Sequence, residues 1–215
     1  MTSRYRDYGY TIAGHASGAA GHALATKFVS IVSGLGRVKS VCDLGCGNGY
    51  LASLLGNAGF AVTGVDASPS GIDVAKRHYS ADNVDFLCVD FDASDVLSQI
   101  SGAPFDAIVS SDVIEHLYRP ASLIEIARSI LKPSGHLIVG TPYHGYVKNL
   151  AIAVAGKWDT HHGPNWNGGH IKFFSVGTLE ELIEKHGFVG ARFEFHGRAP
   201  LLWKNMICIA RKSGG

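Results

Sequence analysis

The sequence has almost no excess charge of either sign. Of its 215 residues, 19 are lysine or arginine and 18 are aspartate or glutamate, which gives a formal net charge of +1. It contains no run rich in lysine or arginine. Proteins that attract polyanions through their overall field carry a clear positive excess. The composition therefore argues against a nucleic acid as the main partner.

Cysteine is scarce, and its spacing is not that of a metal site. The four cysteines, Cys42, Cys46, Cys88 and Cys208, include no pair separated by two residues. Three of them lie in or beside apolar runs, which is typical of reduced, packed thiols.

No stretch reaches the roughly 18 apolar residues that a membrane-spanning helix needs. The first seven residues, MTSRYRD, are not typical of a signal peptide, so we expect a cytoplasmic protein.

What the chain does have is a regular alternation of strand and helix patterns. Its hydrophobic content of 46% is enough for one domain with a three-layered core. This alternation predicts a mostly parallel sheet with helices on both faces. We expect strands over 40–44, 61–65, 84–89, 105–110 and 136–141, a closing antiparallel pair over 189–196 and 202–210, and helices over 16–32, 49–57, from 69, from 120 and over 178–185. Ser68 is predicted to cap the helix that begins at Pro69. Thr178 is predicted to open a capping box for the last helix. A turn is expected over 132–135.

The most informative segment is VCDLGCGNGYLA, from Val41 to Ala52. An apolar strand leads into a loop with glycine at three alternate positions and then into a helix. Glycines in such a turn allow positive φ and let a ligand lie against the main chain. A further acid, Asp66, ends the next apolar run 19 residues after Gly47, where a carboxylate suits a ribose. These features predict a site for a nucleoside-containing cofactor.

The charge of the loop helps to distinguish the possible cofactors. Asp43 lies directly before Leu44 and Gly45. A carboxylate is unfavourable beside the pyrophosphate of a dinucleotide, and it is favourable beside a cationic cofactor without phosphate. The run Asp43-x-Gly45-x-Gly47-x-Gly49 resembles the signature of class I S-adenosylmethionine-dependent methyltransferases.

The resemblance covers roughly residues 38–190 and implies roles for individual residues. Asp43, Gly45 and Gly47 would hold the methionine end of S-adenosylmethionine, Asp66 the ribose and Asp90 the adenine. The segment 105–117 resembles the family's fourth motif, and 131–137 resembles its "LKPGG" turn with Ser134 in place of a glycine. The implied cofactor site comprises Asp43, Gly45, Gly47, Tyr50, Leu51, Asp66, Ala67, Asp90, Phe91, Ser110 and Ser111.

Within this superfamily the chain is most similar to the ubiquinone-biosynthesis type of O-methyltransferase. The similarity lies in Ile114-Glu115-His116, in Gly140-Thr141-Pro142 and in an aromatic, histidine-rich insertion. It implies methyl transfer to an oxygen of a small aromatic or amphiphilic acceptor, with S-adenosylhomocysteine as the product. His116 is the candidate base, because it follows the fourth strand, where the ligands of such sheets gather. The alternative is a histidine that only packs at the start of a helix.

A metal site is possible beside the cofactor, and the sequence leaves it open. Asp112, Glu115 and His116 have the spacing of one helical face. With His170 they would form a site for Mg²⁺, and small-RNA 2′-O-methyltransferases use a comparable pattern. The alternative is a helix of solvated polar residues at the edge of the cofactor site.

Two further segments border the predicted site. Residues 1–36 are expected to form an N-terminal cap and helix, with Tyr5, Tyr8, Tyr10 and His15 near the cofactor. The insertion from Tyr143 to Phe174 carries an amphipathic pattern from Val147 to Trp158. That pattern fits a lid, a peripheral membrane contact through 146–158, or an ordinary helix packed on the sheet.

We therefore predict a single-domain α/β protein with a Rossmann-like seven-stranded sheet, which methylates a small molecule and binds no nucleic acid. Three alternatives stay open. They are a metal-dependent RNA 2′-O-methyltransferase, a nicotinamide oxidoreductase, which Asp43 disfavours, and a catalytically silent S-adenosylmethionine-binding protein. The sequence does not distinguish O- from N-methylation and does not give the oligomeric state.

Overall fold

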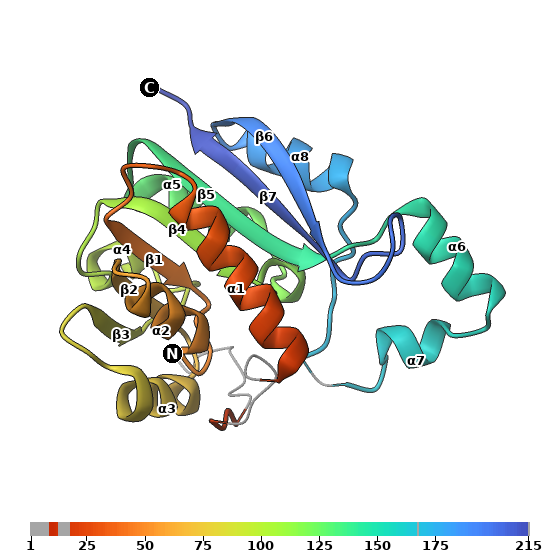
Figure 1. Ribbon diagram of the computed structural model, residues 1–215, viewed down its shortest axis with the longest axis horizontal. Coiled ribbons are helices and arrows are strands. Elements are labelled where there is room, and N and C mark those ends of the chain that lie inside the picture. The colour runs from red at the N-terminus through yellow and green to blue at the C-terminus, as the bar shows by residue number, and fades with distance from the viewer. Residues whose placement is uncertain (1–8, 13–17, 167, 215) are drawn as a thin grey trace.

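A seven-stranded sheet forms the centre of the molecule (Figure 1). The computed structural model describes residues 9–12, 18–166 and 168–214. The strand order is β3-β2-β1-β4-β5-β7-β6, and β7 runs antiparallel to both of its neighbours while the other pairs are parallel. The predicted Rossmann-like sheet with its antiparallel C-terminal pair is thus confirmed. The strands are β1 (Ser40–Leu44), β2 (Ala61–Asp66), β3 (Val84–Cys88), β4 (Phe105–Ser111), β5 (Leu131–Pro142), β6 (Phe188–His196) and β7 (Asn205–Lys212).

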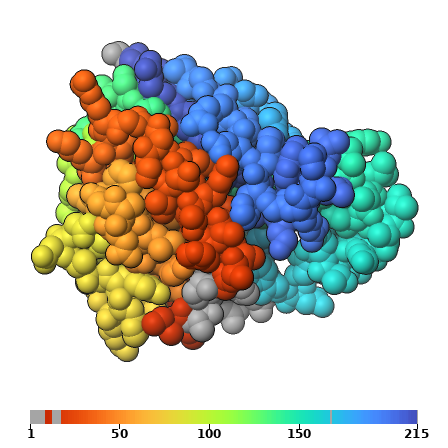
Figure 2. Space-filling model, viewed as in Figure 1, coloured from red at the N-terminus to blue at the C-terminus, as the bar shows by residue number. Residues whose placement is uncertain are grey.

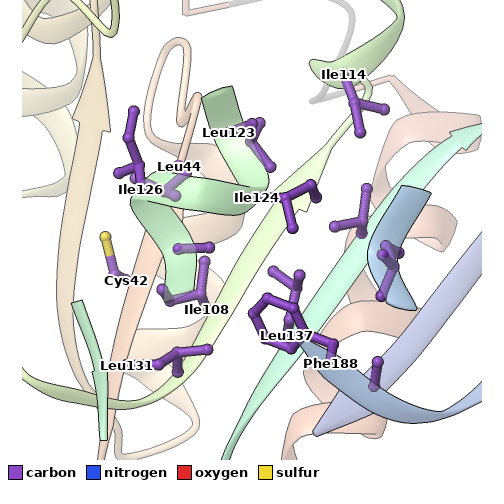
Figure 3. Packing of buried hydrophobic residues seen from close by; sticks show 14 of the residues in the cluster. Cys42, Leu44, Ile108, Ile114, Leu123, Ile124, Ile126, Leu131, Leu137 and Phe188 are labelled. Atoms are coloured by element: carbon purple, nitrogen blue, oxygen red, sulfur yellow. The ribbon is translucent and has the colours of Figure 1, made fainter. Parts of the chain in front are cut away.

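Helices cover both faces of this sheet. One core contains buried side chains of α1, α2 and α3, and the other contains those of α5 and α8. Figure 3 shows the second core, in which Leu123 and Ile124 of α5 lie above Ile108 and Leu137 of the sheet. The helices are α1 (Ala19–Ser33), α2 (Tyr50–Asn57), α3 (Pro69–Tyr79), α4 (Val96–Gln99), α5 (Ala121–Ile130), α6 (Tyr146–Val154), α7 (Trp158–His162) and α8 (Val176–Lys185), with a 3₁₀ turn, η2 (Ile114–His116).

The two-sided core follows from the composition of the central strands. Ala107, Ile108 and Val109 of β4 are all fully buried. Successive side chains of a strand point to opposite faces. Ile108 accordingly packs in the core with α5, while Ala107 and Val109 pack in the core with α1. A continuous apolar run is therefore what a strand covered on both faces requires.

The ends of several elements differ from the predictions. Ser68 caps α3 as predicted, and its side chain accepts a hydrogen bond from the Gly71 N–H. The capping box of α8, however, pairs Ser175 with Thr178, so Thr178 occupies the third position of the helix and not the cap. Serine is preferred over threonine as an N-cap, which favours Ser175, but the spacing of the residues alone did not separate the two.

The expected turn over 132–135 lies within a strand. Leu131 pairs with Phe105 and His136 with Ala107, so the intervening residues form an irregularity in the ladder between β4 and β5. Ser134 takes φ +60° there, where the resembling signature has glycine. The last strand also begins at Asn205 and not at Leu202. Within the described residues, no helix is long and apolar enough to cross a membrane.

The insertion between β5 and α8 stands away from the sheet. In Figure 1, α6 and α7 extend to one side of the molecule, beyond the carboxyl end of β5. The chain then returns, and the N–H groups of Ile171 and Lys172 donate to the Glu115 carbonyl in η2 at 2.9 and 3.0 Å. The insertion thus rejoins the sheet at the edge where ligands of parallel sheets bind.

Candidate functional site

The glycine loop joins the end of β1 to α2. Gly45, Gly47 and Gly49 have φ values of +84°, +54° and +83°. The N–H groups of Gly45 and Cys46 donate to the Val65 carbonyl at 2.7 and 3.1 Å, which ties the loop to the end of β2. A positive φ at three alternate positions explains why the sequence has glycine at each of them.

Asp43 lies beneath this loop and is 1% exposed. Burial and, to a smaller extent, the nearby Asp66 raise the pKa of its carboxyl to about 8, and a hydrogen bond from the Ala52 N–H opposes both effects. Its Oδ2 has no hydrogen-bond partner among the residues that the structure describes. Ionising a buried carboxyl without a partner is costly, so the group holds a proton near pH 7 in the free protein, and a cationic ligand would favour its ionised form.

Asp66 has a structural role that the sequence did not show. Its Oδ2 accepts from the Gly47 N–H at 2.8 Å, and its Oδ1 accepts from the Ser68 N–H at 2.8 Å. The carboxylate therefore holds the glycine loop and the start of α3 together. Its predicted contact with a ribose stays a prediction, at a position that suits it.

The remaining predicted cofactor residues lie along the same edge of the sheet. The Val89 N–H donates to the Asp66 carbonyl at 2.9 Å, which places the segment containing Asp90 and Phe91 next to Asp66. Asp90 and Phe91 are half-buried, and Asp90 Oδ1 accepts from the Asp92 N–H at 3.0 Å. Ser110 is buried and donates from Oγ to the Leu44 carbonyl at 2.7 Å, so it fixes the end of β4 to that of β1. The hydroxyl of Tyr50 lies 2.6 Å from His22 Nδ1, and the hydroxyl of Ser111 donates to Asp112 at 3.4 Å. Leu51 is buried and Ala67 is half-buried.

Tyr10 lies over the glycine loop. A Cβ at Gly47 would lie 3.1 Å from its ring. The Tyr10 N–H donates to Ser70 Oγ at 3.0 Å, and Asn48 Nδ2 donates to the Thr11 carbonyl at 3.1 Å. This segment is where N-terminal residues were expected to cover the cofactor. The other residues predicted for this cap, Tyr5, Tyr8 and His15, lie outside the described residues.

Glu115, His116 and His170 come together next to this edge. Their ligand atoms lie within 4.8 Å of one another. Glu115 is 1% exposed, and its Oε2 accepts from Thr141 Oγ1 at 2.9 Å. Its Oε1 lies 3.9 Å from His170 Nε2 and has no hydrogen-bond partner in the described part of the chain. Burial raises the pKa of Glu115 well above its usual range.

The prediction that Asp112 joins this group is wrong. Asp112 takes φ +54° at the end of β4, and the helical turn begins only at Ile114. Helical spacing therefore does not apply to Asp112, whose Oδ1 accepts from Asn205 Nδ2 at 2.9 Å. Two imidazoles and one carboxylate remain, a donor set that suits Mn²⁺, Fe²⁺ or Zn²⁺ better than Mg²⁺.

His116 is oriented by the insertion. Its Nδ1 donates to the Gly168 carbonyl at 2.8 Å, which leaves Nε2 as the acceptor nitrogen. Burial lowers its pKa from the usual value, against the effect of hydrogen bonds to the backbone of residues 168 and 169. The imidazole is therefore neutral near pH 7 and can accept a proton or coordinate a metal at Nε2.

A cavity of about 220 Å³ lies at the carboxyl end of β5, between the insertion and the β6–β7 connection. We call it the basic cavity. It was missed by reasoning from the sequence, because its cations come from segments about 50 residues apart, and no local motif connects them. Its basic side chains are His144, Lys148, His161, His162, His170, Arg198 and Lys204.

Helix α6 does not pack its apolar side on the sheet, so the interpretation as an ordinary packed helix is wrong. Val147 and Leu150 are about half exposed, and Val154 is 80% exposed. The buried residue of α6 is Lys148, whose Nζ donates to the Tyr143 carbonyl at 2.7 Å. The expected single helix also stops at Val154, and α7 begins at Trp158 after Gly156 with φ +62°.

Solved structures resemble this fold at low sequence identity. Magnesium protoporphyrin IX methyltransferase from Synechocystis PCC 6803, solved with bound S-adenosylhomocysteine, aligns with a TM-score of 0.67 at 20% identity, over 89% of this chain and 83% of that one. The [4+2]-cyclase SpnF aligns with a TM-score of 0.66 at 20% identity, over 91% and 83%. At this identity the likeness shows the fold alone.

Sequence comparison is more specific. A ubiquinone biosynthesis O-methyltransferase from Cereibacter sphaeroides is 32% identical over 148 residues, which are 67% of this chain and 58% of that protein. The chain thus spans less than two thirds of this relative's length. The model of a family described as "Methyltransferase domain" matches residues 19–191. This chain belongs to that methyltransferase domain family.

Proposed function

We propose that this chain uses S-adenosylmethionine to methylate a hydroxyl oxygen of a small aromatic or amphiphilic acceptor. The observation that carries the proposal is the buried carboxylate of Asp43, with Oδ2 unpartnered in the described chain, beneath the glycine loop. A carboxylate in this place favours a cationic amino group and disfavours a pyrophosphate. That preference separates this cofactor from a nicotinamide dinucleotide.

The residues of the loop fit this cofactor. Asp43, Gly45 and Gly47 would hold its methionine end, in a loop whose three glycines take positive φ. Asp66 would hold the ribose and Asp90 the adenine, from the ends of neighbouring strands β2 and β3. When bound, the cofactor supplies a methyl group activated by its sulfonium. The chain must align the acceptor oxygen and remove its proton.

His116 is the residue that we propose for this proton. Its Nδ1 hydrogen bond to Gly168 leaves Nε2 as the acceptor, and burial keeps the ring neutral by lowering its pKa. The hydroxyl of a phenol ionises readily, so a neutral imidazole suffices as its base. His116 lies just beyond β4, at the edge where the cofactor would present its methyl group.

Calorimetric binding of S-adenosylhomocysteine tests the cofactor assignment. We expect the wild-type chain to bind it and not NADH, with the same affinity in the presence and absence of Mg²⁺. Asp43→Asn should weaken binding by about 10- to 100-fold, the effect of losing one hydrogen bond to a charged group. Binding of NADH, or unchanged affinity in the variant, would contradict the proposal. Binding without turnover on a broad panel of phenols would instead indicate a silent cofactor-binding protein.

We also propose that α6 contacts a membrane surface. Its exposed side carries Tyr146, Leu150 and Val154, and exposed Trp158 follows at the start of α7. Exposed aromatic and aliphatic side chains beside Lys157 suit the interface of an anionic bilayer. Figures 1 and 2 show this segment standing out from the rest of the molecule, where a flat surface can reach it.

Co-sedimentation with phosphatidylcholine vesicles containing phosphatidylglycerol tests this contact. The double variant Leu150→Glu and Val154→Glu should lose most of the binding, because it places two charges in the interface. Leu97→Glu on α4 is the matched control, since Leu97 is also about half exposed. Equal binding by both variants, or none by the wild type, would show that α6 does not contact the bilayer.

A further inference from the structure

The basic cavity brings together cations without acidic partners. Lys148 comes from α6, while Arg198 and Lys204 come from the β6–β7 connection. In the described part of the chain, no ion pair includes any of these three side chains. No aspartate or glutamate is among the described residues that line the cavity. Converging like charges are unfavourable unless an anion balances them.

The histidines of the cavity add hydrogen-bond donors. His162 Nε2 is buried and has no hydrogen-bond partner within the described residues. His144 and His162 are stacked with ring centroids 5.6 Å apart, and burial and Lys148 lower the pKa of His144 to about 4. Burial and Arg198 lower the pKa of Lys148 to about 8, so the lysine is still mostly charged near pH 7. The cavity thus combines one buried cation, Lys148, and two exposed ones, Arg198 and Lys204, with neutral imidazoles.

The nearby acids belong to other contacts. Glu115 Oε1 approaches His170 at 3.9 Å, and its Oε2 accepts from Thr141. Asp112 accepts from Asn205, which also lines the cavity. Neither carboxylate pairs with Lys148, Arg198 or Lys204.

The cavity adjoins the edge of the sheet at which we propose that the cofactor presents its methyl group, since Pro142 at the end of β5 lines it. Asp112 directly follows Ser111 and lines a second cavity of about 340 Å³, which shares Arg198, Lys204 and Asn205 with the basic cavity. A ligand that reaches from Ser111 toward these three residues would therefore place its far end among the cations. The near end of such an acceptor would face the end of β4, and its far end would meet the positive charge of the basic cavity.

We infer that the basic cavity holds an oxyanion group of the acceptor, a carboxylate or a phosphate, while the acceptor hydroxyl faces the cofactor. This inference rests on the proposed function, and it defines the acceptor as an anionic hydroxylated compound. Arg198 presents a planar fork that matches either oxyanion, and Lys204 adds a point charge beside it. The inference predicts that neutral acceptors of the same shape bind poorly.

Binding of three matched probes tests the inference. The probes are 3-hydroxybenzoate, 3-hydroxyphenyl phosphate and the neutral 3-hydroxybenzamide, each titrated by NMR into the chain loaded with S-adenosylhomocysteine. We expect both anions to bind at least tenfold more tightly than the amide. The more tightly bound anion identifies the group as a carboxylate or a phosphate.

The double variant Arg198→Gln and Lys204→Gln should remove the preference for the anions and keep the affinity for S-adenosylhomocysteine. The control is Arg37→Gln, an exposed arginine in the α1–β1 connection, which should preserve the preference. Equal binding of the three probes to the wild type, or an unchanged preference in the double variant, would overturn the inference. If S-adenosylhomocysteine itself does not bind, the proposed function fails, whereas the probe titrations without it still decide whether the cavity takes an anion.

Discussion

The carboxyl of Asp43 makes the stability of the free protein depend on pH. The pKa of a carboxyl is near 4 in an unfolded chain, and burial raises that of Asp43 to about 8 in the folded one. Between these two values the folded state holds a proton that the unfolded state has lost. Stability therefore falls as pH rises through this window, by about 1.4 kcal/mol per pH unit for one such group.

The variant Asp43→Asn should accordingly be more stable than the wild type at pH 8, and the difference should shrink as the pH approaches 4. The amide cannot ionise, so the variant lacks this contribution to the slope. Urea unfolding of both proteins at pH values from 4 to 8 measures the difference. A constant difference in unfolding free energy across this range would show that Asp43 ionises in the folded protein as it does in water.

His116 should set the acidic limit of activity. Burial lowers its pKa from the usual value of 6.5, so its protonation should reduce kcat only below that pH. His116→Gln preserves a donor to the Gly168 carbonyl and removes the base. We expect it to lower kcat by about 100-fold or more while S-adenosylhomocysteine affinity stays unchanged.

A chelator separates this role from metal binding. If His116 acts as a base, EDTA leaves the activity of the wild type unchanged. Loss of activity in EDTA and recovery with Mn²⁺ would indicate that Glu115, His116 and His170 are metal ligands. Their ligand atoms lie within 4.8 Å of one another, which permits this.

Among the elements, those with local signals were predictable from the sequence. The strands from Ser40 and Ala61 begin where they were expected, because apolar runs bounded by glycine or polar residues define them. The glycine loop was predictable for the same reason. The packing of helix α6 was not predictable. Its apolar residues recur with a period of 3.6, which predicts that Leu150 and Val154 are buried. In the structure Lys148 is buried instead, and its Nζ donates to the Tyr143 carbonyl.

The site was predictable only where its residues are close in sequence or belong to a known motif. The end of β1, the end of β2 and the segment after β4 were identified in this way. The β6–β7 connection was not, because only folding brings Arg198 and Lys204 to Lys148. Asp112 was misplaced, because its φ of +54° breaks the helical spacing that its neighbours suggested.

The packing of α2 against α3 and β3 predicts that a side chain at Gly49 destabilises the fold. A Cβ at Gly49 would lie 2.7 Å from Ala75 Cβ and 2.8 Å from the Phe86 ring, at φ +83°. Gly49→Ala should therefore lower the unfolding free energy by about 2–4 kcal/mol, from strain and overpacking together. Gly177→Ala in α8 is the matched control, since nothing lies within 4 Å of its Cβ position.

Urea unfolding at one pH measures both variants. Gly177→Ala should be neutral or stabilising by up to about 1 kcal/mol, because alanine reduces the entropy of the unfolded chain. Equal stability of the two variants would mean that α2 shifts away from α3 without cost.

At the scale of the whole molecule, the cofactor would join the segment containing Tyr10 to the edge of the sheet. The segment 9–12 already bonds to α3 through Ser70 and to the loop through Asn48. A ligand held between this segment and β1, β2 and β4 stabilises every part that it touches. At a concentration of 100 Kd, S-adenosylhomocysteine should stabilise the fold by about 2.7 kcal/mol. For a domain of this size, that corresponds to a rise in Tm of about 5–10 °C.

Tyr10→Ala should reduce this rise in Tm, because it removes the ring that lies over Gly47. Tyr118→Ala is the control, since Tyr118 is 91% exposed and far less able to contribute to a buried site. Thermal unfolding of the wild type and both variants, with and without S-adenosylhomocysteine, separates the two effects. A smaller rise in the Tyr10 variant alone would show that the N-terminal segment forms part of the cofactor site. Equal rises in all three proteins would restrict the site to the sheet edge and the glycine loop.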